Sequence, residues 1–165
     1  MTIPARKSPP NRGGAAVGQL QELPPVELSA VLYLRAWCEG GAHRYGVLQD
    51  FRLLMGDEIG QQQFEDFDAL MRLCLSTARC PLMRHGLTCR CFGGHESVFA
   101  QMIAAAAGQD REDAMMFAAT FLTGEAAWQA VQIAEGLGQC FLRSAQHTPD
   151  QPRPTHPNLT TQTRH

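Results

Sequence analysis

The sequence predicts an all-α protein: a compact antiparallel bundle of about six helices with one long central loop rich in cysteine and histidine. Apolar residues recur at three- and four-residue spacing in six successive segments, as on the buried face of a helix. No segment shows the sustained two-residue alternation of a half-buried strand. Apart from the central loop, the connections are short, which favours antiparallel neighbours.

Three helices are predicted before the central loop, over residues 26–38, 44–55 and 57–78. Glycines separate them and are expected to end each helix, because glycine readily adopts the left-handed conformation that follows a last helical turn. Arg35 falls on the apolar spacing of the first helix, and Asp57 is placed to cap the third.

Three more helices are predicted after the loop, over residues 98–108, 110–122 and 125–145, with a short break at 123–124. Asp110 and Asp113 begin the second of these with the spacing of a capping box. Acidic residues in a first turn also interact favourably with the helix dipole. The boundary between these two helices is therefore well marked.

Two tryptophans, Trp37 and Trp128, are expected to anchor the core, since large aromatic side chains bury much apolar surface.

Gly136 and Gly138 lie inside the last predicted helix, where glycine lowers helix propensity. They indicate close packing against a neighbouring helix, or a bend.

One folded domain is predicted over residues 26–145, flanked by tails over 1–25 and 146–165. Both tails are rich in proline and poor in large apolar residues. Such segments cannot bury enough surface to offset the entropy of ordering, so we expect both tails to be disordered.

Charge and apolar content argue against two classes of partner. Between residues 26 and 145, nine arginines face fourteen acidic residues, a net charge of −5, which is unsuited to neutralising the phosphates of a nucleic acid. No apolar run reaches the roughly 18 residues of a membrane span. The N-terminus lacks the apolar stretch of a secretory signal, so we expect a cytoplasmic protein.

Six cysteines in a reducing compartment indicate metal ligands or reactive thiols more often than disulfides. Cys38, Cys74 and Cys140 lie within helical patterns and are expected to pack as small apolar side chains. The other three belong to the stretch "RCPLMRHGLTCRCFGGHE", residues 79–96, which also holds two of the six histidines.

The central loop, residues 79–94, is much longer than the other connections. Long loops inside compact domains are usually functional or disordered. This loop contains Leu82, Met83, Leu87 and Phe92, which favour burial, so we expect something to hold it in place.

A bound metal could hold the loop, and the candidate ligands are Cys80, His85, Cys89, Cys91 and His95. Zinc favours thiolate and imidazole ligands and takes four of them in a structural site. The first four residues form the favoured set, with His95 as the substitute. The chain lacks two separated Cys-x2-Cys pairs, so this zinc site is a hypothesis from composition and spacing.

Three alternatives stay open. In the first, the cysteines act only as small apolar side chains while the histidines hold turns. Cys89 or Cys91 could be a nucleophile, with His85 or His95 as base and Glu96 orienting it. The same two cysteines could form a labile disulfide that responds to redox conditions. Iron–sulfur ligation is less favoured, because it usually takes four cysteines.

The stretch "PLMRHGLTCRCFGGHESVFA", residues 81–100, resembles stretches in a family of small uncharacterised bacterial helical proteins. No activity is known for that family, so the resemblance implies none here. We expect a non-enzymatic regulatory or adaptor protein that acts through a protein partner and has a structural zinc site within residues 79–95. The first alternative is a metal-free interaction domain, and the second is a thiol-based redox sensor or Cys/His enzyme. The sequence leaves the oligomeric state open.

Overall fold

Six α-helices make up most of residues 12–147, the part of the chain that the computed structural model describes. The predicted tails therefore lie outside the described residues over 1–11 and 148–165. The helices are α1 Pro25–Glu39, α2 Gly41–Met55, α3 Asp57–Thr77, α4 Gly94–Ala107, α5 Arg111–Phe121 and α6 Gly124–His147. Two short strands are also present, β1 Ala16–Gln19 and β2 Cys91–Gly93, with 3-10 turns at Arg12–Gly14 and Leu20–Glu22.

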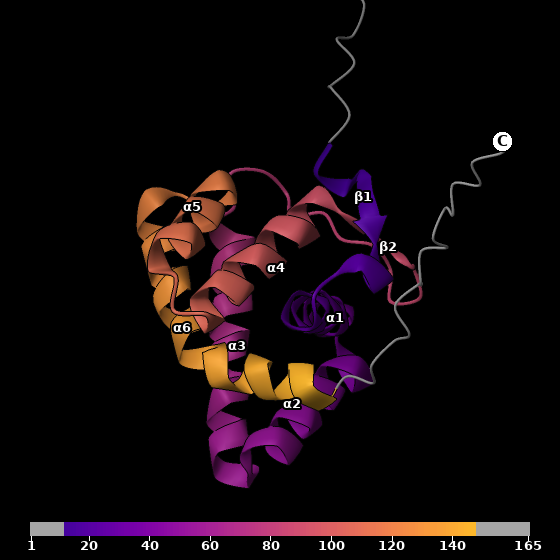
Figure 1. The fold of residues 1–165 in the computed structure, drawn as a ribbon, viewed down its shortest axis with the longest axis vertical. Helices are drawn as coiled ribbons and strands as arrows, with labels where there is room; N and C mark the ends of the chain where they lie inside the picture. Colours follow the sequence, from indigo (N-terminus) through magenta and orange to yellow (C-terminus); the bar gives the residue numbers. More distant parts are fainter. Residues whose placement is uncertain (1–11, 148–165) are drawn as a thin grey trace, which may run out of the picture.

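The predicted all-α bundle is confirmed. Figure 1 shows α1 end-on, whereas α3 stands upright beside it, so these two helices cross steeply. Helices α2 and α3 pack together, as do α4 and α5, and α6 contacts α3, α4, α5 and α1. Within residues 12–147, none of the helices is both long enough and apolar enough to cross a membrane.

The ends of α1 and α2 follow the predicted glycine signals, whereas α2 and α4 begin three and four residues earlier than predicted, at Gly41 and Gly94. Gly40 and Gly56 end α1 and α2 with positive φ angles of 76° and 88°, a conformation that favours glycine. Gly56 also occupies the cap position of α3, so Asp57 lies in the first turn of that helix and does not cap it through its side chain. Asp110 does cap α5, because its carboxylate accepts a hydrogen bond of 3.1 Å from the backbone N–H of Asp113.

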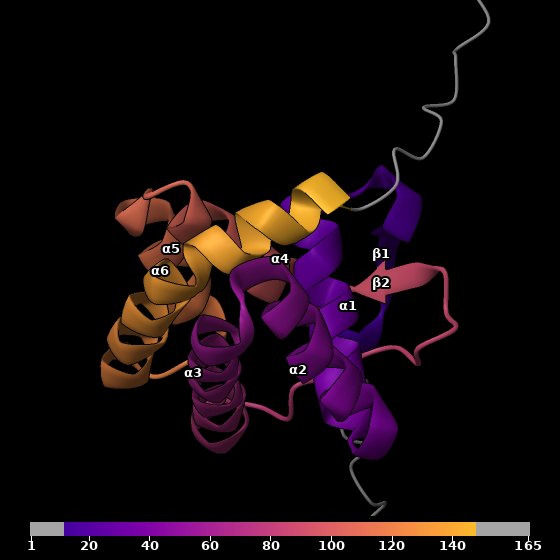
Figure 2. The same cartoon turned by 90° about the horizontal axis from the view of Figure 1, so that it is seen from below.

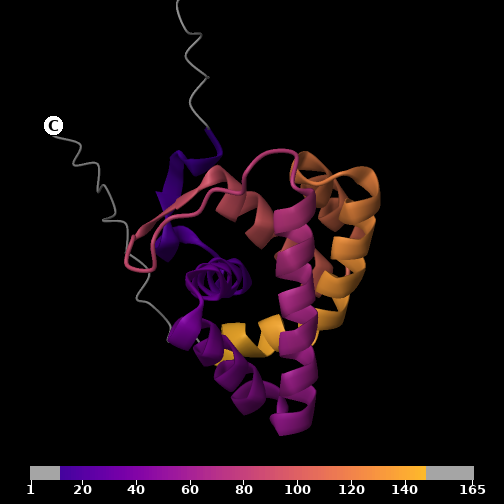
Figure 3. The ribbon, with the colours of Figure 1, turned by 180° about the vertical axis from the view of Figure 1, so that it is seen from behind.

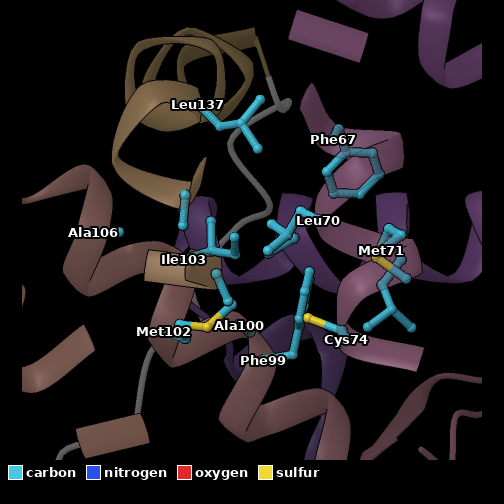
Figure 4. Close-up of a cluster of buried hydrophobic side chains, with 14 of the residues drawn as sticks. Phe67, Leu70, Met71, Cys74, Phe99, Ala100, Met102, Ile103, Ala106 and Leu137 are labelled. Carbon is cyan, nitrogen blue, oxygen red and sulfur yellow. The ribbon is translucent and has the colours of Figure 1, made fainter. Parts of the chain in front are cut away.

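The core lies where α3, α4 and α6 meet (Figure 4). Cys74 of α3 lies beside Phe99 of α4, Leu70 of α3 faces Ile103 of α4, and all four side chains are fully buried. Burial raises the pKa of Cys74 to about 12, so this thiol is neutral in the folded protein. The expectation that it packs as a small apolar side chain is confirmed.

Only one of the two tryptophans anchors the core. Trp37 is 4 % exposed, and its indole N–H donates a hydrogen bond of 2.9 Å to Asp68. Trp128 is 51 % exposed, so the prediction that it faces inward is wrong. The buried face of α6 includes Ala127 and Val131, and Trp128 lies beside that face. The small side chain of Ala127 lets neighbouring helices approach closely.

Residues 12–24, which the sequence assigns to a tail, contain β1 and both 3-10 turns. Strand β1 pairs antiparallel with β2, so that Gly18 lies opposite Phe92 and Gln19 lies opposite Cys91. Strands of three and four residues are too short to show an alternating pattern, and each contains a glycine. This pairing brings the start of the described chain against the central loop (Figure 1).

Candidate metal centre

The central loop leaves α3 at Ala78 and crosses to the two strands, as Figure 3 shows from behind. Ala78 forms an isolated antiparallel bridge with Leu122 after α5. The next residue, Arg79, donates its backbone N–H to Phe121 and its Nε–H to Leu122, each at 2.9 Å. One end of the loop is therefore held at the end of α5, and the other is held by β1 and α4.

A buried arginine lies beneath the loop. Arg35 of α1 and Glu96 of α4 are both fully buried and form a two-pronged ion pair. The Nε–H of Arg35 donates to Oε1 of Glu96 at 2.7 Å, and an Nη2–H donates to Oε2 at 3.2 Å. This fork uses the planar geometry of guanidinium, which a lysine cannot reproduce.

The remaining donors of Arg35 hold the loop backbone. Nη1 donates to the carbonyl oxygens of Gly86 at 3.2 Å and Cys89 at 2.7 Å, while Nη2 donates to that of Cys91 at 2.7 Å. All five N–H groups of the guanidinium therefore have acceptors. Carbonyl groups in an irregular segment need such donors when they are buried, so Arg35 determines the path of the loop.

Glu96 joins the loop to the start of α4. Its Oε2 accepts a hydrogen bond of 2.8 Å from the backbone N–H of Gly93, the cap residue of that helix. Its Oε1 accepts a weaker one, at 3.2 Å, from the backbone N–H of His85. A carboxylate that reaches back to the cap residue satisfies an N–H that the helix itself cannot bond.

Three of the five predicted ligands meet above this ion pair. One ligand atom each from His85, Cys89 and Cys91 lies within 4.8 Å of the others, and all three residues are half-buried. The two sulfur atoms are 2.7 Å apart, and Sγ of Cys91 is 3.5 Å from Nδ1 of His85. This is the one such group within residues 12–147.

The imidazole ring of His85 has a defined orientation. Its Nε2 lies 2.9 Å from the carbonyl oxygen of Gly14, to which an Nε2–H can donate. Nδ1 faces the carbonyl oxygen of Cys91 at 3.1 Å and Oε2 of Glu96 at 3.5 Å, besides the Cys91 sulfur. The ring is therefore held between the Gly14 carbonyl on one side and the Cys91 residue on the other. Metal-binding histidines commonly donate their other N–H to a carbonyl in this way.

The two thiols are electrostatically unequal. A hydrogen bond from the Cys91 thiol lowers the pKa of Cys89, since it stabilises the thiolate. The same hydrogen bond raises the pKa of Cys91, because ionisation would remove the donor. The nearby Arg35 guanidinium favours the thiolate at both positions. Cys89 is therefore the more acidic of the two thiols.

The present sulfur separation is shorter than a metal would impose. Two zinc–sulfur bonds of about 2.3 Å at a tetrahedral angle place the sulfurs about 3.8 Å apart. Zinc binding would therefore move Cys89 and Cys91 apart by about 1 Å from their separation of 2.7 Å. Rotation of the side chains in a half-buried loop can supply such a movement.

Cys80 and His95 are not brought to this group and form a pair of their own. Sγ of Cys80 is 3.7 Å from Nε2 of His95, and Nδ1 of His95 accepts a hydrogen bond of 2.9 Å from the backbone N–H of Met83. Cys80 is exposed. The five residues predicted together as metal ligands thus divide into a group of three and a pair.

Sequence reasoning did not assign Arg35 a part in the site and named Glu96 only as an orienter in the enzyme alternative. One signal was present: Arg35 falls on the apolar spacing of α1, where an arginine must be buried or reach past the core. A buried arginine needs an acidic partner, and Glu96 is the acid closest in sequence to the candidate ligands.

Comparison of this chain with models of protein families, with curated proteins and with solved structures finds no match. The proposed function therefore rests on the geometry of the site.

Proposed function

We propose that this chain is a small helical metal-binding protein of regulatory or adaptor type, in which His85, Cys89 and Cys91 hold a zinc ion. The observation that carries the proposal is the convergence of three ligand atoms within 4.8 Å. The contact of 2.9 Å between His85 Nε2 and the Gly14 carbonyl supports it, because an Nε2–H that donates there turns the Nδ1 lone pair toward the Cys91 side of the group.

The donor set favours zinc over harder cations. Two sulfurs and one imidazole nitrogen are soft or borderline ligands, whereas magnesium and calcium prefer oxygen. The nearest carboxylate, Glu96, is already engaged by Arg35 and by two backbone N–H groups. Two thiolates would neutralise the charge of a divalent ion, so binding would leave no net charge on the half-buried ligands.

The described residues supply three ligands, and zinc prefers four. Water or a group from a second molecule would complete the coordination. A ligand supplied by a partner protein would make association dependent on the metal, which supports a regulatory or adaptor role. A bound ion would also strengthen the link between the loop and the N-terminal segment, because His85 already contacts Gly14.

Zinc content and affinity test the proposal. We expect about one zinc per chain in untagged protein purified without added metal, measured by elemental analysis. Cys89→Ser should lose most of this zinc in competition with a chromophoric chelator. Cys80→Ser is the matched control, because it removes a cysteine of the same loop that lies outside the group of three.

Cobalt substitution gives a second readout. Two thiolates on cobalt should produce a thiolate-to-metal charge-transfer band, which should fall by about half in Cys91→Ser and stay unchanged in Cys80→Ser. Metal should also raise the melting temperature of the parent protein. Absence of zinc and of any cobalt spectrum in the reduced parent protein would refute the proposal. Equal losses in Cys80→Ser and Cys89→Ser would refute the ligand assignment.

A further inference from the structure

Cys89 and Cys91 are free thiols with one residue between them, and their sulfur atoms lie 2.7 Å apart. A disulfide bond is about 2.05 Å long, whereas a tetrahedral zinc ion would hold the two sulfurs about 3.8 Å apart. The same pair can therefore reach either state by a small movement. The two states exclude each other, since the disulfide leaves no thiolate to bind a metal.

We propose that the Cys89–Cys91 pair undergoes thiol–disulfide exchange with a low-molecular-weight disulfide of the glutathione type, and that the resulting intramolecular disulfide releases the metal. The regulatory part of this inference rests on the proposed zinc site. The exchange reaction itself depends only on the two cysteines and their surroundings.

Access to the pair is open on the side of Cys89. A hollow of about 470 Å³ lies between the loop and the segment after β1, and Cys89, Arg90 and Leu20 are among its lining residues. Cys91 is not among them, so a molecule in this hollow would contact residue Cys89 and not Cys91. The exposed Arg90 can pair with a carboxylate of a peptide disulfide. Figure 2 shows this part of the loop projecting beyond the helices beside β2.

The reaction has two balanced steps. The Cys89 thiolate attacks one sulfur of glutathione disulfide, forming a mixed disulfide and expelling one glutathione thiolate. Cys91 then attacks the Cys89 sulfur and gives up its thiol proton. This forms the Cys89–Cys91 disulfide and expels the second glutathione, which takes the proton. Two electrons pass from the protein to the reagent, and each glutathione disulfide yields two glutathione molecules.

Oxidation would also loosen the contact with the N-terminal segment. A metal on Nδ1 would help to hold the His85 ring, whose Nε2 lies 2.9 Å from the Gly14 carbonyl oxygen, and its release would remove that support. Cys91 is paired with Gln19 of β1, so a change at this cysteine reaches the two-stranded sheet directly. The redox state of one pair would thereby control both metal binding and this contact.

The test equilibrates the full chain with glutathione buffers of increasing oxidised fraction, once metal-free and once loaded with zinc. Alkylation followed by peptide mass spectrometry identifies each disulfide, and a chromophoric chelator measures released zinc. We expect a Cys89–Cys91 disulfide in both samples, with one zinc released per disulfide in the loaded sample. Cys91→Ser should stop at a mixed disulfide on Cys89, and Cys80→Ser should behave as the parent does.

The outcomes separate the two proposals. Disulfide formation in a protein that never binds zinc would support the exchange and refute the zinc site. Zinc binding without a Cys89–Cys91 disulfide at any buffer ratio would refute the exchange and leave the zinc site standing. Glutathione found on Cys80 alone would also refute the exchange, because it would show that simple exposure decides which thiol reacts.

Discussion

Two arginine–glutamate pairs in this molecule share one geometry and differ in their surroundings. Arg35 pairs with Glu96 through its Nε and Nη2 atoms, and Arg111 of α5 pairs with Glu135 of α6 through the same two atoms. The first pair is fully buried. In the second, the arginine side chain is 59 % exposed and the glutamate side chain 24 % exposed.

The buried pair has many further partners. Arg35 also donates to three loop carbonyls, and Glu96 also accepts from two backbone N–H groups of the loop and the start of α4. Arg111 and Glu135 join one helix to another and bind no loop. Two ion pairs of the same geometry thus have different effects. The pair of Arg35 and Glu96 organises the central loop, whereas the pair of Arg111 and Glu135 adds only a surface contact between two helices.

The difference shows what burial of an ion pair can achieve. Removing two charges from water is costly, and a buried pair is by itself weak evidence for stability. Here the pair replaces the backbone hydrogen bonds that a helix or sheet would have supplied to the loop. Its main effect is therefore to fix the position of Cys89, Cys91 and His85.

The largest expected effect comes from replacing Arg35 with methionine. The variant leaves the Glu96 carboxylate buried without its partner and leaves three loop carbonyls without a donor. We expect the free energy of unfolding to fall by about 3–5 kcal/mol. Urea denaturation followed by circular dichroism measures this change.

The matched control is Arg111→Met, which makes the same exchange at the surface pair and should cost less than about 1 kcal/mol. The double variant Arg35→Met, Glu96→Leu should recover part of the loss, because the unpaired buried charge is gone. It should not recover metal binding, since the loop carbonyls still lack their donor. Equal costs for Arg35→Met and Arg111→Met would show that burial makes no difference.

A smaller effect is expected where the N-terminal segment meets the loop. A Cβ atom added at Gly18 would lie 2.8 Å from ring carbons of Phe92, which is 7 % exposed. Gly18→Ala should therefore lower the free energy of unfolding by about 1–3 kcal/mol through overpacking. Hydrogen exchange should quicken at the backbone N–H of Leu20, which bonds the Arg90 carbonyl at 2.7 Å.

Gly86→Ala is the control for this variant, because a Cβ at Gly86 meets nothing within 4 Å. It changes the same loop without touching the contact between Gly18 and Phe92. Similar exchange rates at Leu20 in both variants would show that the N-terminal strand does not depend on this close approach.

Much of the helical fold could be predicted because its signals are local. Gly40 and Gly56 end helices through their own backbone conformation. Gly138 was expected to mark close packing, and a Cβ there would lie 3.1 Å from Cα of Ala107 in α4. A Cβ atom added at Gly136 would meet nothing within 4 Å, because this glycine lies on the other side of α6. Helical spacing places Gly138 with Val131 and Phe141 on the buried face and Gly136 nearly opposite, although the prediction treated the two glycines alike.

The site could be predicted only in part, because its organisation depends on distant contacts. Arg35 and Glu96 are 61 positions apart, and no local pattern pairs them. The candidate ligands were found from composition, but their division depends on the path of the loop, which separates Cys80 from Cys91. The strand that brings Gly14 to the loop is too short to have a sequence signature.

The smallest expected effect is the pH dependence of the surface pair. A hydrogen bond from Arg111 lowers the pKa of Glu135 below its ordinary value of 4.5. A lowered carboxyl pKa in the folded state stabilises the protein fully above pH 4.5, and this contribution disappears as the pH falls through the folded pKa. The difference in unfolding free energy between the parent and Arg111→Met should therefore be less than about 1 kcal/mol at pH 7 and shrink in acid. It should also shrink at high salt, because the pair is exposed to screening ions. A difference that stays constant with pH and salt would mean that Arg111 acts through packing of its aliphatic stem, and the two arginines would then differ in chemistry as well as in burial.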